Sequence, residues 1–199
     1  MDRHHKPSTW IIQIKADYTI LEIEGFRFGE RPILIKEMAW FNIGTRSGDS
    51  VIFKFTDNQT KNLDLHDWKQ MRYYEKNIHG IPFFFGDTPF ETLPLIIRVI
   101  KTHCRCLVTK GREKTALLRD LFELPVIDLG ETLGTPSYRK LLAKFPVPDS
   151  FYCKYHGRGK SFPPVHCSQV KSNLLLSYCL QRNVIKSSHD DSVGFDTVR

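Results

Sequence analysis

The sequence contains no long hydrophobic run and no pattern of paired cysteines. No stretch approaches the roughly 20 consecutive apolar residues that a transmembrane helix requires, so we expect no membrane contact. The first ten residues are polar and lack the apolar core of a signal peptide. The five cysteines are odd in number and show no disulfide framework. These absences predict an intracellular protein of the nucleus, the cytoplasm or both, with reduced thiols that can bind metal.

A nucleotide-binding loop is also missing. The segment "TKGREK" places a glycine between basic residues, as phosphate-binding turns do, but it lacks the spacing of a Walker motif. We therefore expect no nucleotide cofactor.

Positive charge is in excess and is concentrated in two segments. The chain has 29 Lys and Arg against 22 Asp and Glu, a net charge of +7. Residues 138–171 hold seven basic residues and one acid, and residues 105–119 hold five and one. Two such concentrations indicate an anionic partner, and nucleic acid is the commonest.

The hydrophobic pattern predicts a mixed α/β domain. Three β-rich segments joined by short turns, 18–26, 32–43 and 50–57, indicate an antiparallel meander. We then expect helices at 64–77, 86–103, 111–122, 137–145 and 167–181, with strands at 104–110 and 124–129. This is the order of the ribonuclease H-like fold, a mixed sheet flanked by helices whose first strand carries metal-binding acids. The predicted domain spans residues 1–182, and a flexible acidic tail spans 183–199.

The segment "CKYHGRGKSFPPVHC", residues 153–167, has the character of a metal site. Cys153 and His156 have the Cys-x2-His spacing of a short zinc chelate, because two intervening residues bring a thiolate and an imidazole together. Cys167 is expected in the first turn of the last helix, whose N-terminus favours the thiolate form. Zinc needs a fourth ligand for a closed tetrahedral site. The alternative is that both cysteines are simply buried thiols.

Three segments resemble a known superfamily. "LEIEGF" resembles the first motif of the DEDD-type 3′–5′ exonucleases, "CLVTKGREKTALL" the second, and "HCSQVK" the third. The closest resemblance is to the Maelstrom domain, a degenerate branch of that superfamily found in the piRNA pathway, and to insect and transposon-related proteins with an "IEGF" strand. It implies a ribonuclease H-like fold with a structural zinc that clips the loop onto the domain.

The resemblance also suggests the fourth zinc ligand. His79 is the first candidate, because related proteins have a similar His-Gly turn. Glu75 is the second, because the Maelstrom site uses a glutamate. His166 is a local alternative, although its position beside Cys167 would strain a tetrahedral site.

The acids that exonucleases use to bind two metal ions are incomplete. Glu22 and Glu24 alternate along the first strand and share a face, either as a vestigial metal site or as the solvated face of an edge strand. In the second motif the acid's place falls near Thr115, beside Lys114. Lys171 stands where the third motif has an acid, and its charge repels cations. We therefore expect no two-metal mechanism, and we expect Glu24 to pair with Lys171 instead.

These observations predict a catalytically degenerate module of small-RNA silencing. It would bind single-stranded RNA weakly, or assemble with proteins of a silencing or germline complex. The expected RNA contacts converge on one groove and are Lys110, Arg112, Lys114, Arg158 and Lys160. The alternatives are a single-stranded RNA nuclease that does not use the two-metal site, and a virus- or transposon-derived protein-interaction factor.

Overall fold

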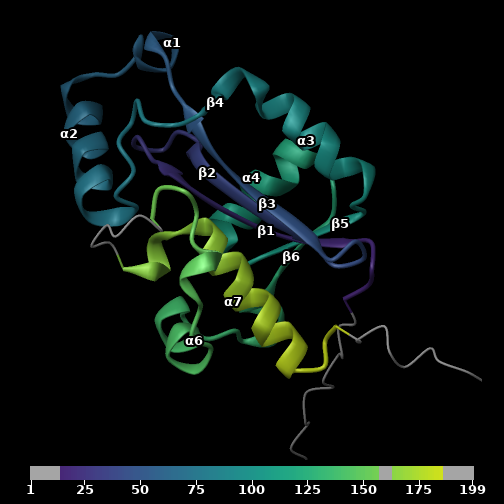
Figure 1. The fold of residues 1–199 in the computed structure, drawn as a ribbon. Coiled ribbons are helices and arrows are strands. Elements are labelled where there is room, and N and C mark those ends of the chain that lie inside the picture. Colours follow the sequence, from purple (N-terminus) through teal and green to yellow (C-terminus); the bar gives the residue numbers. More distant parts are fainter. Residues whose placement is uncertain (1–13, 157–162, 186–199) are drawn as a thin grey trace, which may run out of the picture.

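A six-stranded mixed sheet forms the centre of the structure (Figure 1), a computed structural model that describes residues 14–156 and 163–185. The strands are β1 (Tyr18–Phe26), β2 (Leu34–Asn42), β3 (Ser47–Lys54), β4 (Thr88–Pro89), β5 (Cys106–Thr109) and β6 (Val126–Asp128). Their order across the sheet is β4-β3-β2-β1-β5-β6. The first three strands are antiparallel neighbours, whereas β5 and β6 run parallel to β1 and the two-residue β4 runs parallel to β3.

Helices cover both faces of this sheet. They are α1 (Asp57–Thr60), α2 (Leu65–Tyr73), α3 (Leu93–Thr102), α4 (Arg112–Phe122), α5 (Leu129–Leu133), α6 (Tyr138–Lys144) and α7 (Ser168–Gln181). Shorter turns are η1 (Tyr74–Ile78), η2 (Phe90–Thr92), η3 (Asp149–Phe151) and η4 (Pro164–His166). Helix α7 crosses β1 and β2 on one face with α6 beside it, while α3 and α4 pack in the hydrophobic core of the other face (Figure 1). No helix within the described residues is long and apolar enough to cross a membrane.

Alternation along β1 divides its side chains between the two cores. Leu21 and Ile23 are fully buried in the core beneath α3 and α4, whereas Ile20 packs in the core beneath α7. Glu22 and Glu24 point to the same face as Ile20, where Glu24 accepts from Lys171 of α7 and Glu22 accepts from Lys114 of α4. Because β1 lies between β2 and β5, these acids belong to a central strand, and the edge-strand alternative is wrong.

The "IEGF" segment of β1 contains a change of register. Glu24 pairs with Glu37, but Gly25 pairs with Ile35, so β2 contributes one extra residue at this point. A β-carbon on Gly25 would lie 2.3 Å from the carbonyl oxygen of Leu34, a distance that no side chain tolerates. Glycine is therefore required for the close approach of β1 and β2 beside Glu24.

The predicted α/β order is confirmed, with differences at the ends of elements. The helix predicted at 64–77 is α-helical only to Tyr73 and continues as the wider turn η1. The short elements α1, α5 and β4 were not predicted. Val184 and Ile185, which the prediction assigned to the tail, are buried, and Ile185 forms a parallel bridge with Ile14. The rest of the predicted tail lies outside the described residues.

Candidate metal centre

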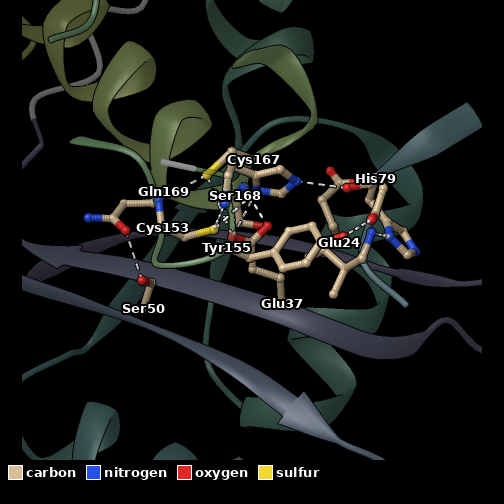
Figure 2. A network of polar contacts seen from close by, with 12 residues as sticks. Glu24, Glu37, Ser50, His79, Cys153, Tyr155, Cys167, Ser168 and Gln169 are labelled. Atoms are coloured by element: carbon tan, nitrogen blue, oxygen red, sulfur yellow. Dashed lines mark hydrogen bonds and ion pairs between the residues drawn. The ribbon is translucent and has the colours of Figure 1, made fainter. Parts of the chain in front are cut away.

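Four buried side chains converge beneath the start of α7. They are Glu37 of β2, Cys153 and His156 of the predicted zinc loop, and Cys167. One ligand atom from each lies within 4.8 Å of all the others, and Figure 2 shows the group between β2 and the first residues of α7. Two thiols, an imidazole and a carboxylate in this arrangement can hold a metal ion. Three of the four residues were predicted.

The orientation of the His156 ring is fixed by contacts on both nitrogens. Nδ1 lies 3.1 Å from the Cys153 sulfur, so this nitrogen faces the cluster. Nε2 lies 2.8 Å from the backbone carbonyl oxygen of His79, which accepts the Nε2 proton. A neutral ring that donates through Nε2 keeps the lone pair on Nδ1, and this is the form that binds a metal.

Cys167 is the residue that joins the loop to α7. It is the N-cap of the helix, with extended backbone angles of φ −94° and ψ 124°, and so it precedes the first turn in which it was expected. Burial raises the pKa of the Cys167 thiol, but its contacts with Cys153, chiefly a hydrogen bond from that thiol, and with the neighbouring His156 outweigh burial and lower it to about 4. The same contact with Cys167, together with burial, raises the pKa of Cys153. The two thiols therefore share one proton, and a bound cation would displace it.

Glu37 completes the cluster from the sheet. One carboxylate oxygen accepts a 2.8 Å hydrogen bond from the backbone N–H of Ser168, and the other lies 3.6 Å from the Cys167 sulfur and 3.9 Å from His156 Nδ1. Glu37 thus caps α7, a role that the Cys167 side chain does not fill. Burial and the neighbouring Cys167 thiolate raise the pKa of Glu37 to about 8, a shift that a cation at this point would reverse.

The three candidates for the fourth ligand lie outside the cluster. His79 Nδ1 accepts a 3.1 Å hydrogen bond from the N–H of Ile81, and burial lowers the pKa of His79 to about 3, so the ring is neutral. A Glu75 oxygen accepts from the N–H of Phe83 at 2.5 Å. His166 lies in η4 and is also not part of the group. Within the described residues Glu37, not His79, is the fourth member of the candidate group, and His79 contributes its backbone carbonyl to His156.

A signal for Glu37 was present in the sequence. It stands in the strand segment "PILIKEMAW", where most other residues are apolar. A charged residue on a strand that becomes fully buried requires a partner, because its desolvation is costly. That requirement marks Glu37 as a candidate ligand, although it does not identify its partners.

A second polar group lies on the same face of the sheet. Glu22 and Glu24, here called the β1 acid pair, share the ammonium of Lys114, which is 2.8 Å from Glu22 and 3.0 Å from Glu24. Lys171 donates to Glu24 as predicted, and the Tyr138 hydroxyl donates to Glu22 at 2.7 Å. Burial raises the pKa of Glu24, but the two lysines outweigh burial and lower it to about 2. Two ammonium groups thus neutralise the β1 acid pair.

The described members of the predicted RNA contacts differ in their exposure and in their partners. Lys114 is engaged with the β1 acid pair, and its side chain is only 19% exposed. Arg112 is exposed and paired with Glu131, and Lys110 lies over the ring of Tyr138 at 5.5 Å. Arg158 and Lys160 lie outside the described residues.

Helix α6 adds basic residues that were not singled out. It begins at Tyr138, whose ring lies 5.5 Å from the ammonium of Lys110 and 5.3 Å from that of Lys171. Arg139, Lys140 and Lys144 of this helix are exposed, so α6 presents three cations to solvent. The composition of residues 138–171 contained this signal, but from that segment the prediction took only Arg158 and Lys160.

Comparison of the chain with protein-family models and with curated proteins found no match. The metal centre and the β1 acid pair therefore carry the functional argument.

Proposed function

We propose that the chain is a ribonuclease H-like domain that binds a structural zinc ion and has lost two-metal nuclease chemistry. The strand order β3-β2-β1-β5-β6, with an antiparallel first half and β5 and β6 parallel to β1, supports this fold. The acidic residues of β1 occupy the central strand, as the resemblance to DEDD-type exonucleases implies.

The observation that carries the proposal is the cluster of four buried donors within 4.8 Å of one another. Thiolate and imidazole ligands favour zinc over magnesium or calcium, which prefer oxygen. Four protein donors leave no coordination position for water, so the site is structural rather than catalytic. The glutamate donor also agrees with the resemblance to the Maelstrom domain, whose zinc site uses a glutamate.

The β1 acid pair supports the loss of nuclease chemistry. Two-metal catalysis requires two divalent cations about 4 Å apart, held by several carboxylates. Here Lys114 and Lys171 neutralise Glu22 and Glu24, and a cation would have to displace both ammonium groups. The domain then serves binding rather than hydrolysis.

The basic surface of α6 and Lys110 supports single-stranded RNA as the ligand. Arg139, Lys140 and Lys144 carry exposed charge at one side of the sheet, where they can contact successive phosphates. Such contacts are independent of sequence, so binding is weak and sequence-tolerant. Together with the resemblance to the Maelstrom domain, this supports a role in small-RNA silencing in the nucleus or cytoplasm, where the domain can also assemble with protein partners.

A titration of labelled single-stranded RNA with zinc-loaded protein, followed by gel analysis of the same samples, tests the proposal. We expect RNA binding that weakens as the salt concentration rises. On the gel, the RNA should stay intact both with and without EDTA. Cleavage that persists in EDTA would favour the metal-independent nuclease. Absence of binding at low salt would leave protein assembly as the function of the domain.

A further inference from the structure

The first turn of α7 connects the metal centre to the β1 acid pair. Cys167, immediately before the turn, is a member of the metal cluster, and the N–H of Ser168 donates to Glu37. Lys171, four residues after Cys167, donates to Glu24. The backbone N–H of Lys171 is also bonded to the carbonyl of Cys167 at 3.0 Å. A shift of Cys167 is therefore transmitted to Lys171 by one helical hydrogen bond.

The sheet places the two acceptors of this turn side by side. Glu24 and Glu37 are directly paired in the antiparallel β1–β2 ladder. Side chains of such a pair lie on the same face with β-carbons about 5 Å apart, and like charges at these positions repel. Each carboxylate therefore needs its own partner, and the start of α7 supplies one to each: Lys171 to Glu24, and the N–H of Ser168 to Glu37.

We propose that a metal ion bound at the zinc site inferred above holds the first turn of α7 in place. The bound metal thereby keeps Lys171 in its ion pair with Glu24. The Lys171–Glu24 ion pair and the metal centre are then two coupled sites. Loss of the metal leaves Glu37, Cys153 and Cys167 buried without their cation, so the link between the loop and α7 loosens and Lys171 separates from Glu24.

The remainder of α7 does not depend on the metal. Leu174, Leu175 and Tyr178 are buried in the core between α7 and the sheet, and they keep the helix docked. Lys114, the other lysine of the acid pair, is carried by α4, which packs against β5 and β6. The coupling is consequently local: it affects Lys171 and leaves Lys114 in contact with Glu22.

Lysine acetylation of the folded full-length chain, read residue by residue by mass spectrometry, tests this inference. Zinc-loaded protein is compared with protein treated with a chelator. We expect Lys171 to be protected in the zinc-loaded form and to react at least about fivefold faster after chelation, the lower range of typical coupling between two sites. Lys114 is the matched control, since it contacts the same acids, and its protection should not change. Lys140 is exposed and should react fast in both forms.

Each other outcome has a defined meaning. If zinc binds and Lys171 reacts equally with and without it, the coupling is wrong and the zinc site stands. If Lys171 and Lys114 lose protection together, the whole domain opens and the local coupling is wrong. If the wild-type protein binds no zinc, both the coupling and the zinc site are wrong.

A reciprocal measurement uses variants. Coupling between binding sites acts equally in both directions, so removal of the Lys171–Glu24 ion pair must lower the affinity for zinc. We expect Lys171→Met to lower zinc affinity at least about fivefold in a competition titration with a chelating dye, again the lower range of typical coupling. Lys114→Met removes an ammonium from the same acids without touching α7 and should leave zinc affinity within about twofold, below that range. Equal effects of the two variants would contradict the proposed route through α7.

Discussion

Glu24 and Glu37 face each other across the β1–β2 ladder, and each carboxylate is neutralised by different chemistry. Glu24 receives the ammonium groups of Lys114 and Lys171. Glu37 receives a helix N–H and stands among two thiols and an imidazole. Neighbouring carboxylates in a protein interior repel unless both are compensated. Two lysines therefore compensate the charge of Glu24, whereas Glu37 belongs to the candidate metal group.

The cluster predicts bound zinc in purified protein. We expect about one zinc per chain, as in a four-ligand structural site, and loss of that zinc in Cys153→Ser. Loss of a structural zinc costs several kcal/mol, and each kcal/mol lowers the melting temperature by about 2–4 °C in a domain of this size. Elemental analysis and thermal melting measure both effects. Cys179→Ser is the control, because Cys179 is a buried cysteine of α7 outside the cluster and its variant should keep zinc.

The identity of the fourth ligand can be tested with two conservative variants. Glu37→Gln keeps the size of the side chain but removes the charge, and we expect it to lower zinc affinity by at least about tenfold. His79→Asn keeps an acceptor for the N–H of Ile81 and leaves the backbone carbonyl that contacts His156, so it should retain zinc. Zinc competition titrations of the two proteins measure this. Loss of zinc in His79→Asn with retention in Glu37→Gln would restore the original expectation.

Local patterns were sufficient for the order of the main strands and helices and for three of the four residues of the candidate metal group. The alternation of β1 placed Glu22 and Glu24 on one face, because side chains of a strand alternate with a period of two. Cys153 and His156 were identified because their spacing alone brings the two ligands together. Lys171 was correctly paired with Glu24 from the resemblance to the third motif.

Long-range geometry explains what was missed. Glu37 reaches the metal cluster only because the β1–β2 register sets it under α7, and that register is not encoded in any single segment. Lys36, its neighbour, is fully buried and donates to the carbonyl oxygens of Phe53 and Phe83 at 2.6 Å each. Lys114 was assigned to RNA from its charge, whereas the rotation of α4 turns it toward Glu22.

Acidic pH should lower the unfolding free energy of the protein, because it protonates Glu24 of the β1 acid pair. The pKa of Glu24 is lowered from 4.5 to about 2, so the folded state releases a proton that the unfolded state holds between these values. The stabilisation is present above pH 4.5 and is lost as the pH falls toward 2, and the shift of 2.5 units corresponds to about 3 kcal/mol. Urea unfolding of wild type and Glu24→Gln, both prepared with zinc, measures it. The difference in unfolding free energy should narrow from pH 5 to pH 2.5; a constant difference would contradict the assigned pKa.

Divalent cations should not activate the domain as an exonuclease. Lys114 and Lys171 occupy the acid pair, so magnesium or manganese should neither raise the melting temperature nor cause stepwise degradation of an RNA labelled at its 5′ end. The double variant Lys114→Met with Lys171→Met leaves two buried carboxylates without compensation, and manganese should stabilise it. Stepwise degradation by wild type that Glu24→Gln abolishes would show that the acid pair is catalytic.

The basic surface predicts which charges contact RNA. Replacement of Arg139 and Lys140 by Glu should weaken RNA binding more than replacement of Lys61 and Lys69 by Glu. Lys61 ends α1 and Lys69 belongs to α2, and both helices lie away from α6 in Figure 1. The two double variants change the net charge equally, so a general electrostatic effect would lower both affinities alike. Fluorescence anisotropy over a range of salt concentrations gives the affinity and its slope, about −0.7 per phosphate contact on a log–log plot. We expect a shallower slope for the α6 variant only, because it alone loses phosphate contacts; equal slopes in both variants would remove α6 from the RNA surface.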